Sequence, residues 1–137
     1  MAQKINQTQS QGTTLGFGTS SSTNQTGITT ETTVSGVTTI ITIPPGGRRI
    51  KITATAQVYT SINGDVGELK IKQDGVNMKT SRHLLTSTTS TQMISVASFV
   101  PTAGSHTYLF TVARNSGTGT LLIENVVNPA EMLVEII

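Results

Sequence analysis

The stretch Pro44-Pro45-Gly46-Gly47-Arg48-Arg49 runs directly into Ile50-Lys51-Ile52-Thr53-Ala54-Thr55-Ala56-Gln57-Val58-Tyr59. A cluster of Pro and Gly followed at once by alternating apolar and polar residues predicts a turn and then a β-strand. Successive side chains of a strand point to opposite faces, so the apolar members share one face. We therefore predict a strand over residues 50–59 whose core-facing side chains are Ile50, Ile52, Ala54, Ala56 and Val58.

The same pattern repeats along the chain. A second Pro/Gly turn at residues 101–106 precedes β-formers at 107–114, and Asp74-Gly75 between two short alternating segments predicts a two-residue hairpin. The remaining predicted strands cover residues 38–43, 69–72, 76–79, 84–85, 93–100, 120–126 and 132–137, with one or two short edge strands between 15 and 36. No segment has helical periodicity, so the sequence predicts an all-β, antiparallel sandwich or barrel.

The chain divides into two unequal parts. Its 137 residues suit a single domain. Residues 1–14 are too polar to bury enough surface to order themselves, and we expect a flexible N-terminal arm there. Residues 15–137 are the predicted sandwich domain.

Two strands are apolar on both faces, around residues 93–100 and at the C-terminus. A strand of this kind needs two dry neighbours, one of which is the core. The other is expected to be a second copy of the chain, and the aromatic-poor core, with no Trp and three Phe, also favours burial between copies. The residues expected at this interface are Phe99, Met132, Leu133, Val134, Ile136 and Ile137.

Composition excludes several classes of function. The net charge of +2 comes from nine basic and seven acidic residues scattered along the chain, which argues against a nucleic-acid partner. The chain has no Cys, no signal-peptide pattern and no apolar run long enough to span a membrane, so we expect no membrane partner.

The residues that could carry chemistry do not form a known catalytic or metal-binding pattern. His83 and His106 are the candidate bases, and each is more simply explained by a surface or turn-capping role. Asp65, Glu68 and Asp74 lie near one another without the spacing of a calcium loop. We expect no enzymatic activity, no cofactor, no metal and no small-molecule substrate.

Four motifs resemble a known family. They are Gly47-Arg48-Arg49-Ile50-Lys51-Ile52, Ala103-Gly104-Ser105-His106-Thr107-Tyr108, Ser116-Gly117-Thr118-Gly119-Thr120 and, as a partial match, the apolar end from Met132 to Ile137. Together they resemble the trimeric jelly-roll module, similar in fold to tumour necrosis factor, of bacteriophage capsid decoration proteins and tail-tip or fibre domains. The resemblance covers about residues 14–137 and implies a jelly roll that assembles as a homotrimer.

The family offers two functions. The first is a capsid decoration (cement) protein that binds the major capsid protein and stabilises the head shell; the second is a tail-tip or fibre domain that recognises a host-surface molecule. Only a short polar arm precedes the sandwich here, which favours decoration over the head of a stalk. The expected location is then the capsid surface of the virion, after synthesis in the host bacterial cytoplasm. The expected capsid contacts are Lys4, Gln7, Gln9, Arg48 and Arg49.

Overall fold

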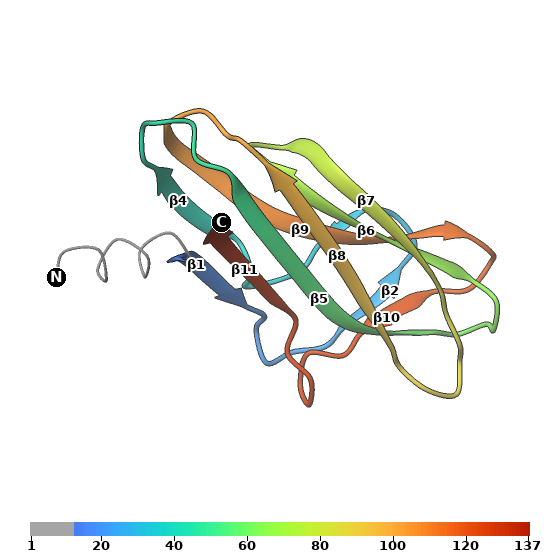
Figure 1. The fold of residues 1–137 in the computed structure, drawn as a ribbon. Helices are drawn as coiled ribbons and strands as arrows, with labels where there is room; N and C mark the ends of the chain where they lie inside the picture. Colours follow the sequence, from blue (N-terminus) through green and yellow to red (C-terminus); the bar gives the residue numbers. More distant parts are fainter. Residues whose placement is uncertain (1–12) are drawn as a thin grey trace, which may run out of the picture.

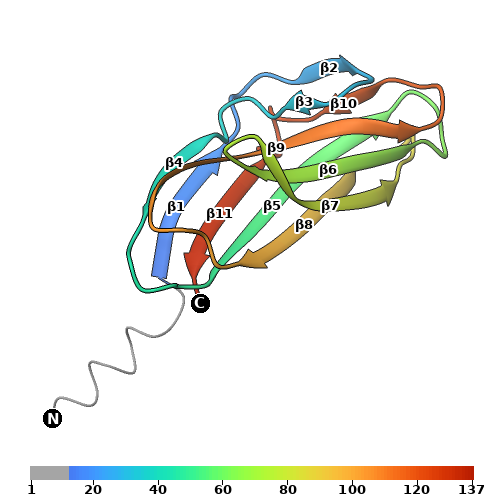
Figure 2. The same cartoon turned by 90° about the horizontal axis from the view of Figure 1, so that it is seen from above.

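The computed structural model describes residues 13–137, and these form two antiparallel sheets packed face to face. The β5 sheet has six strands: β1 (Thr13–Thr19), β2 (Gln25–Ile28), β5 (Ile50–Thr60), β8 (Thr91–Phe99), β10 (Leu121–Ile123) and β11 (Glu131–Ile136). The β9 sheet has five: β3 (Thr32–Thr33), β4 (Thr39–Ile43), β6 (Val66–Gln73), β7 (Val76–Leu84) and β9 (Gly104–Ser116). Figures 1 and 2 show the two layers from the side and from above.

Strand β5 is the centre of its sheet. It pairs with β8 from Ile50 to Val58 on one side, and on the other side with β11 and then β10. Strand β1 extends the sheet beyond β11, and β2 extends it beyond β10. In the β9 sheet the long strand β9 pairs with β6 on one side and with β3 and β4 on the other. The all-β antiparallel jelly-roll sandwich expected from the sequence is confirmed.

The core lies between the two sheets. The five apolar side chains predicted to face inward from β5 are all buried. They meet Leu69 and Ile71 from β6 and Tyr108 and Phe110 from β9. No helix in the described part of the chain is long and apolar enough to cross a membrane.

The boundaries of β1 and β10 differ from the sequence prediction. Strand β1 begins at Thr13, which pairs with Ile136, so residues 13 and 14 belong to the sandwich rather than to the arm. Residues 1–12, the rest of the predicted arm, lie outside the described residues. Strand β10 ends at Ile123 instead of residue 126, because the backbone amides of Asn125 and Val126 donate to the side chain of Asn24 (2.8 and 3.0 Å) rather than to a neighbouring strand.

Candidate functional site

One end of the sandwich is formed by the turn that precedes β5. Arg48 and Arg49 are exposed there, and neither makes an ion pair within residues 13–137. The turn bends through Gly46 and Gly47, whose φ angles of 110° and 65° lie where residues with a Cβ are strained. The carbonyl of Arg49 accepts a hydrogen bond from the amide of Ile137 (3.1 Å). The arginine pair therefore lies beside the C-terminus.

Strand pairing brings other segments to the same end, which we call the arginine end. Thr13, where residues 1–12 join the domain, is opposite Ile136, and β8 reaches this end at Phe99. Figure 2 shows the starts of β1 and β5 and the ends of β8 and β11 together. The exposed side chains of Val100 (49%) and Ile137 (47%) add apolar surface. The arginine end thus combines two unpaired positive charges with exposed apolar groups.

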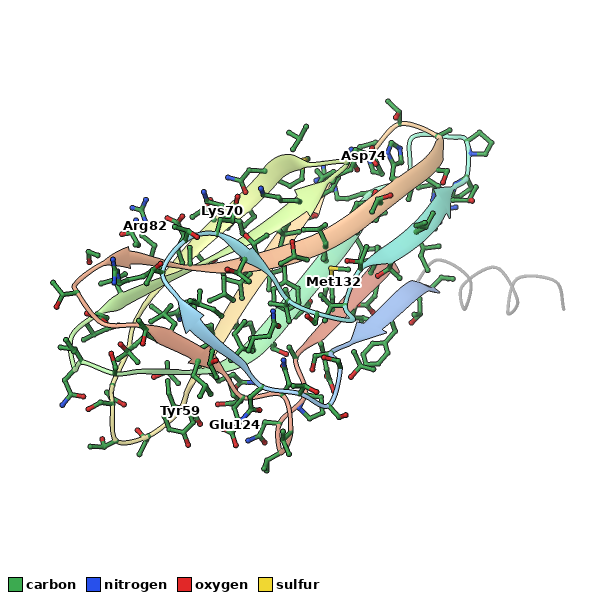
Figure 3. The ribbon with its side chains drawn as sticks, turned by 180° about the vertical axis from the view of Figure 1, so that it is seen from behind. Tyr59, Lys70, Asp74, Arg82, Glu124 and Met132 are labelled. Carbon is green, nitrogen blue, oxygen red and sulfur yellow. The ribbon has the colours of Figure 1, made fainter. Side chains whose placement is uncertain are left out.

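The predicted interface between copies needs a correction. Met132, Val134 and Ile136 are buried within the chain's own core, and Figure 3 shows Met132 between the layers. The sequence showed that β11 is apolar on both faces, but these three side chains have no surface left for another copy. Leu133, Ile137 and the partly buried Phe99 remain available, and an interface through them stays a prediction.

The outer face of the β5 sheet carries a trough. Its wide part, of about 340 Å³, lies over Thr53 and Leu133, with Phe17 from β1 at its side. Its narrow part, of about 240 Å³, lies between Gln57 of β5, Gln92 of β8 and the loop 127–129 that joins β10 to β11. Both Thr55 and Glu131 line the two parts, so the two parts are neighbours along the sheet.

Side chains in the trough differ along its length. Phe17, Leu133 and Thr53 follow one another across β1, β11 and β5, because each is opposite the next in the strand register. Beside them the amino group of Lys51 lies 3.7 Å from the carboxylate of Glu135. The wide part is therefore apolar in its middle, with Lys51 and Glu135 paired and Glu131 as its third charged residue.

The predicted turn histidine His106 has a structural role. Its Nδ1 lies 2.6 Å from a carboxylate oxygen of Asp74, and its Nε2 lies 2.8 Å from the carbonyl of Thr102. The hydrogen bond to Asp74 and then the one to Thr102 raise the pKa of His106 above its ordinary value, while the pKa of Asp74 is lowered, first by its bond to His106 and then by the amide of Thr107. Both ring nitrogens are occupied by acceptors, so the ring fastens the hairpin turn at 74–75 to the loop before β9.

His83 also serves the backbone. Its Nε2 lies 3.0 Å from the carbonyl and 3.3 Å from the amide of Ile94, on the edge of β8 that faces away from β5. The neighbouring hydroxyl groups of Ser81 and Ser95 lie 2.7 Å apart. These side chains join β7 to β8 and cover part of an otherwise unpaired strand edge.

The three acidic residues that lie near one another in the sequence bind different partners in the structure. Asp65 is buried and binds a turn, Asp74 binds His106, and Glu68 binds Arg82 (3.0 Å) and Lys70 (3.2 Å) on the outer face of the β9 sheet. Burial raises the pKa of Glu68, but the bonds from Arg82 and Lys70 outweigh it and leave the pKa lowered. In the described ranges no group of three potential ligands could hold a metal ion.

One member of this surface network was not recognised in the sequence. Glu31, from the loop before β3, accepts from Lys72 (2.8 Å) and from the hydroxyl of Thr111 (3.1 Å). The bond from Lys72 is the main reason that the pKa of Glu31 is lowered. Figure 3 shows Lys70 and Arg82 on the same face. Because these charged side chains pair with one another, this face is less open to a ligand than the outer face of the β5 sheet.

Comparison with known proteins identifies the fold and no family. No protein-family model matches the chain, and no curated protein matches it significantly. Among solved structures, VP2 of infectious bursal disease virus matches over 88% of this chain and 36% of VP2, with a TM-score of 0.50 and 12% identity. An insecticidal delta-endotoxin of Bacillus thuringiensis matches over 79% of this chain and 19% of its own, with a TM-score of 0.49 and 10% identity.

Carbohydrate-binding modules have similar folds. A CBM36 module solved with calcium and xylotriose matches over 88% of this chain and 99% of its own, with a TM-score of 0.48 and 10% identity. The chain spans only about a fifth to about a third of the endotoxin and the viral protein. At these identities the likeness concerns the fold alone.

Proposed function

We propose that this chain is a structural protein of a phage virion, a homotrimeric decoration protein that attaches to the major capsid protein and stabilises the head shell. The observation that carries the proposal is the arginine end. Three of the four motifs that resemble the phage family reach this end, at residues 47–52, 103–108 and 132–137, whereas residues 116–120 lie at the opposite end. Residues 1–12 join the domain there, and Arg48 and Arg49 have no ion-pair partner within the described residues. The β-sandwich fold by itself suits a structural or a binding protein.

The arginine end has the properties of an attachment surface. Two guanidinium groups without carboxylate partners in the described residues can bind carboxylates of a coat protein in paired hydrogen bonds. Val100 and Ile137 supply apolar area around them. We place the contacts between copies at the same end, through Phe99 and Ile137, so that three arginine pairs face one capsid site.

The N-terminal arm supplies a second attachment. Twelve residues can extend about 40 Å at roughly 3.3 Å per residue, which is enough to reach a neighbouring coat subunit. Three arms tethered to one trimer act at high effective concentration, and weak individual contacts then add to strong binding. Lys4, Gln7 and Gln9 are the proposed contact residues of the arm.

Co-sedimentation with undecorated capsids tests the proposal. The full-length protein is compared with a deletion of residues 1–12 and with Arg48→Glu, and Lys79→Glu, which makes the same charge change on the exposed part of β7, is the control. We expect the deletion and Arg48→Glu to weaken capsid binding at least about tenfold, while Lys79→Glu binds like the parent. Equal binding by all four proteins contradicts the role of the arginine end and the arm. Binding to host cells but not to capsids supports the receptor-binding alternative instead.

Oligomeric state is measured on the same proteins. Light scattering should give three copies per particle for the parent, the deletion and Arg48→Glu. A monodisperse monomer contradicts the homotrimer.

A further inference from the structure

The trough on the outer face of the β5 sheet is not part of the attachment surface proposed above, and its geometry suits an extended ligand. It follows β5 from Lys51 to Gln57, seven residues that span about 20 Å of strand. Thr55 and Glu131 line both of its parts. A long and open surface of this kind fits a linear chain lying along the strand better than a compact molecule.

The narrow part presents side-chain amide groups that have no hydrogen-bond partner in the described structure. Gln57 and Gln92 are directly opposite in the register of β5 and β8, and Asn128 lies across from them in the β10–β11 loop. Within residues 13–137 none of these three side chains makes a hydrogen bond, and neither does the carboxylate of Glu131. A carboxamide offers two donors and one acceptor oxygen, which matches neighbouring hydroxyl groups that each donate and accept.

The wide part presents an apolar surface at the other end. The ring of Phe17 is 53% exposed and lies next to Leu133 across the β1–β11 pair. Leu133, which the sequence predicted at an interface between copies, forms the apolar floor of this part. An exposed aromatic ring beside a row of polar groups fits a ligand that has both a C–H face and hydroxyl edges.

The charges of the trough select against an ionic ligand. Lys51 is paired with Glu135 at 3.7 Å, which leaves Glu131 as the one unpaired charged group that lines the trough in the described structure. A single carboxylate accepts hydroxyl donors and repels phosphate, sulfate and carboxylate groups. The complementary ligand is therefore neutral and rich in hydroxyl groups.

We propose that the trough binds a neutral, linear oligosaccharide, with amides of Gln57, Gln92 and Asn128 hydrogen-bonded to its hydroxyl groups and Phe17 stacked on one sugar ring. This inference goes beyond the proposed function and does not depend on it, because the trough starts beside the arginine end at Lys51 and runs away from it along β5 to Gln57.

Chemical-shift perturbation by NMR tests the proposal. The probes are xylohexaose, cellohexaose, maltohexaose and chitotetraose, each added to the full-length protein up to about 10 mM, which detects binding near the millimolar range. We expect at least one probe to shift backbone amides of β5, β8 and β11 along the trough. No shift with any of the four, or shifts confined to other surfaces, overturns the proposal.

Variants separate recognition from folding. Phe17→Ala should weaken the affinity for the probe at least about tenfold, a loss near 1.4 kcal/mol. The double variant Gln57→Ala with Gln92→Ala should weaken it by at least the same factor. Asn77→Ala, on the outer face of β7, is the matched control and should bind like the parent. Circular dichroism and thermal unfolding show that each variant is folded. If Phe17→Ala or the double variant changes the number of copies in light scattering and leaves sugar binding unchanged, the trough is an interface between copies and the proposal is wrong.

Discussion

Asp65 and Gly119 are 54 positions apart, and the amide of Gly119 donates a hydrogen bond of 3.1 Å to the Asp65 carboxylate. The same carboxylate, 1% exposed, accepts from the hydroxyl of Thr60 (2.5 Å) and the amide of Thr118 (3.2 Å). Arg114 donates to the carbonyl of Gly119 and completes the arrangement. One buried acid therefore holds the turn after β9 against the start of β6.

Replacing this acid should destabilise the fold. Asp65→Asn exchanges one acceptor oxygen for a donor and leaves at least one buried amide or hydroxyl group without its partner. We expect the free energy of unfolding to fall by about 2–3 kcal/mol, as for other hydrogen bonds to a buried charged group. Urea denaturation measures the change. Glu124→Gln, a half-buried acid outside this arrangement, is the control and should stay within about 0.5 kcal/mol of the parent.

A methyl group at Gly117 should be more harmful than one at Gly46. Both residues have positive φ, 102° and 110°, so both variants carry backbone strain. A Cβ at Gly117 would lie 1.9 Å from a carboxylate oxygen of Asp65, whereas a Cβ at Gly46 would meet nothing within 4 Å. Gly117→Ala is expected to cost about 2 kcal/mol more than Gly46→Ala, because it adds overpacking to the same strain. Equal losses in thermal unfolding would show that the clash is relieved by a small shift.

Two neighbouring residues of β11 should differ strongly in how the same substitution affects stability. Val134 is buried in the core, and Leu133 is half-buried on the outer face. Val134→Asn places an unpaired polar group in the core and should lower the free energy of unfolding by about 3 kcal/mol or more. Leu133→Asn should leave the fold nearly unchanged. Denaturation combined with light scattering checks both, and a stable, well-folded Val134→Asn that only loses its partner copies would contradict the assignment of Val134 to the core.

Stability should depend on pH through His106 and Asp74. The pKa of His106 is raised above 6.5, so its contribution is complete below about pH 6.5 and is lost as the pH rises through the folded-state pKa. The pKa of Asp74 is lowered from 3.8, so its contribution is present above that value and is lost as the pH falls further. The pair is therefore most stabilising at a pH between 3.8 and 6.5, the ordinary pKa values of the two groups.

Unfolding measured across pH, together with an NMR titration of the His106 ring, tests this dependence. The parent should lose stability above neutral pH relative to its value in mild acid, and His106→Asn should lose most of that slope. A ring that titrates at or below 6.5 would contradict the prediction.

Much of the fold was predictable because it rests on local patterns. Alternation over residues 50–59 identified both the strand and its buried face, and Gly in the turns at 46–47 and 74–75 marked chain reversals that the structure confirms. The arginine pair could likewise be recognised as an exposed turn from its place between Pro/Gly and a strand. These features depend on residues within a few positions of one another.

What the tertiary structure alone decided depends on pairs far apart in the sequence. Alternation showed that β11 has two apolar faces, but not that Met132 and Val134 would be fully covered by the chain's own second sheet. Nothing in the sequence joined Asp65 to Gly119, or placed Gln57, Gln92 and Asn128 around one trough. A strand period reports which side chains share a face; the register between distant strands, set by the packing of two whole sheets, decides which of those faces meet and which remain open.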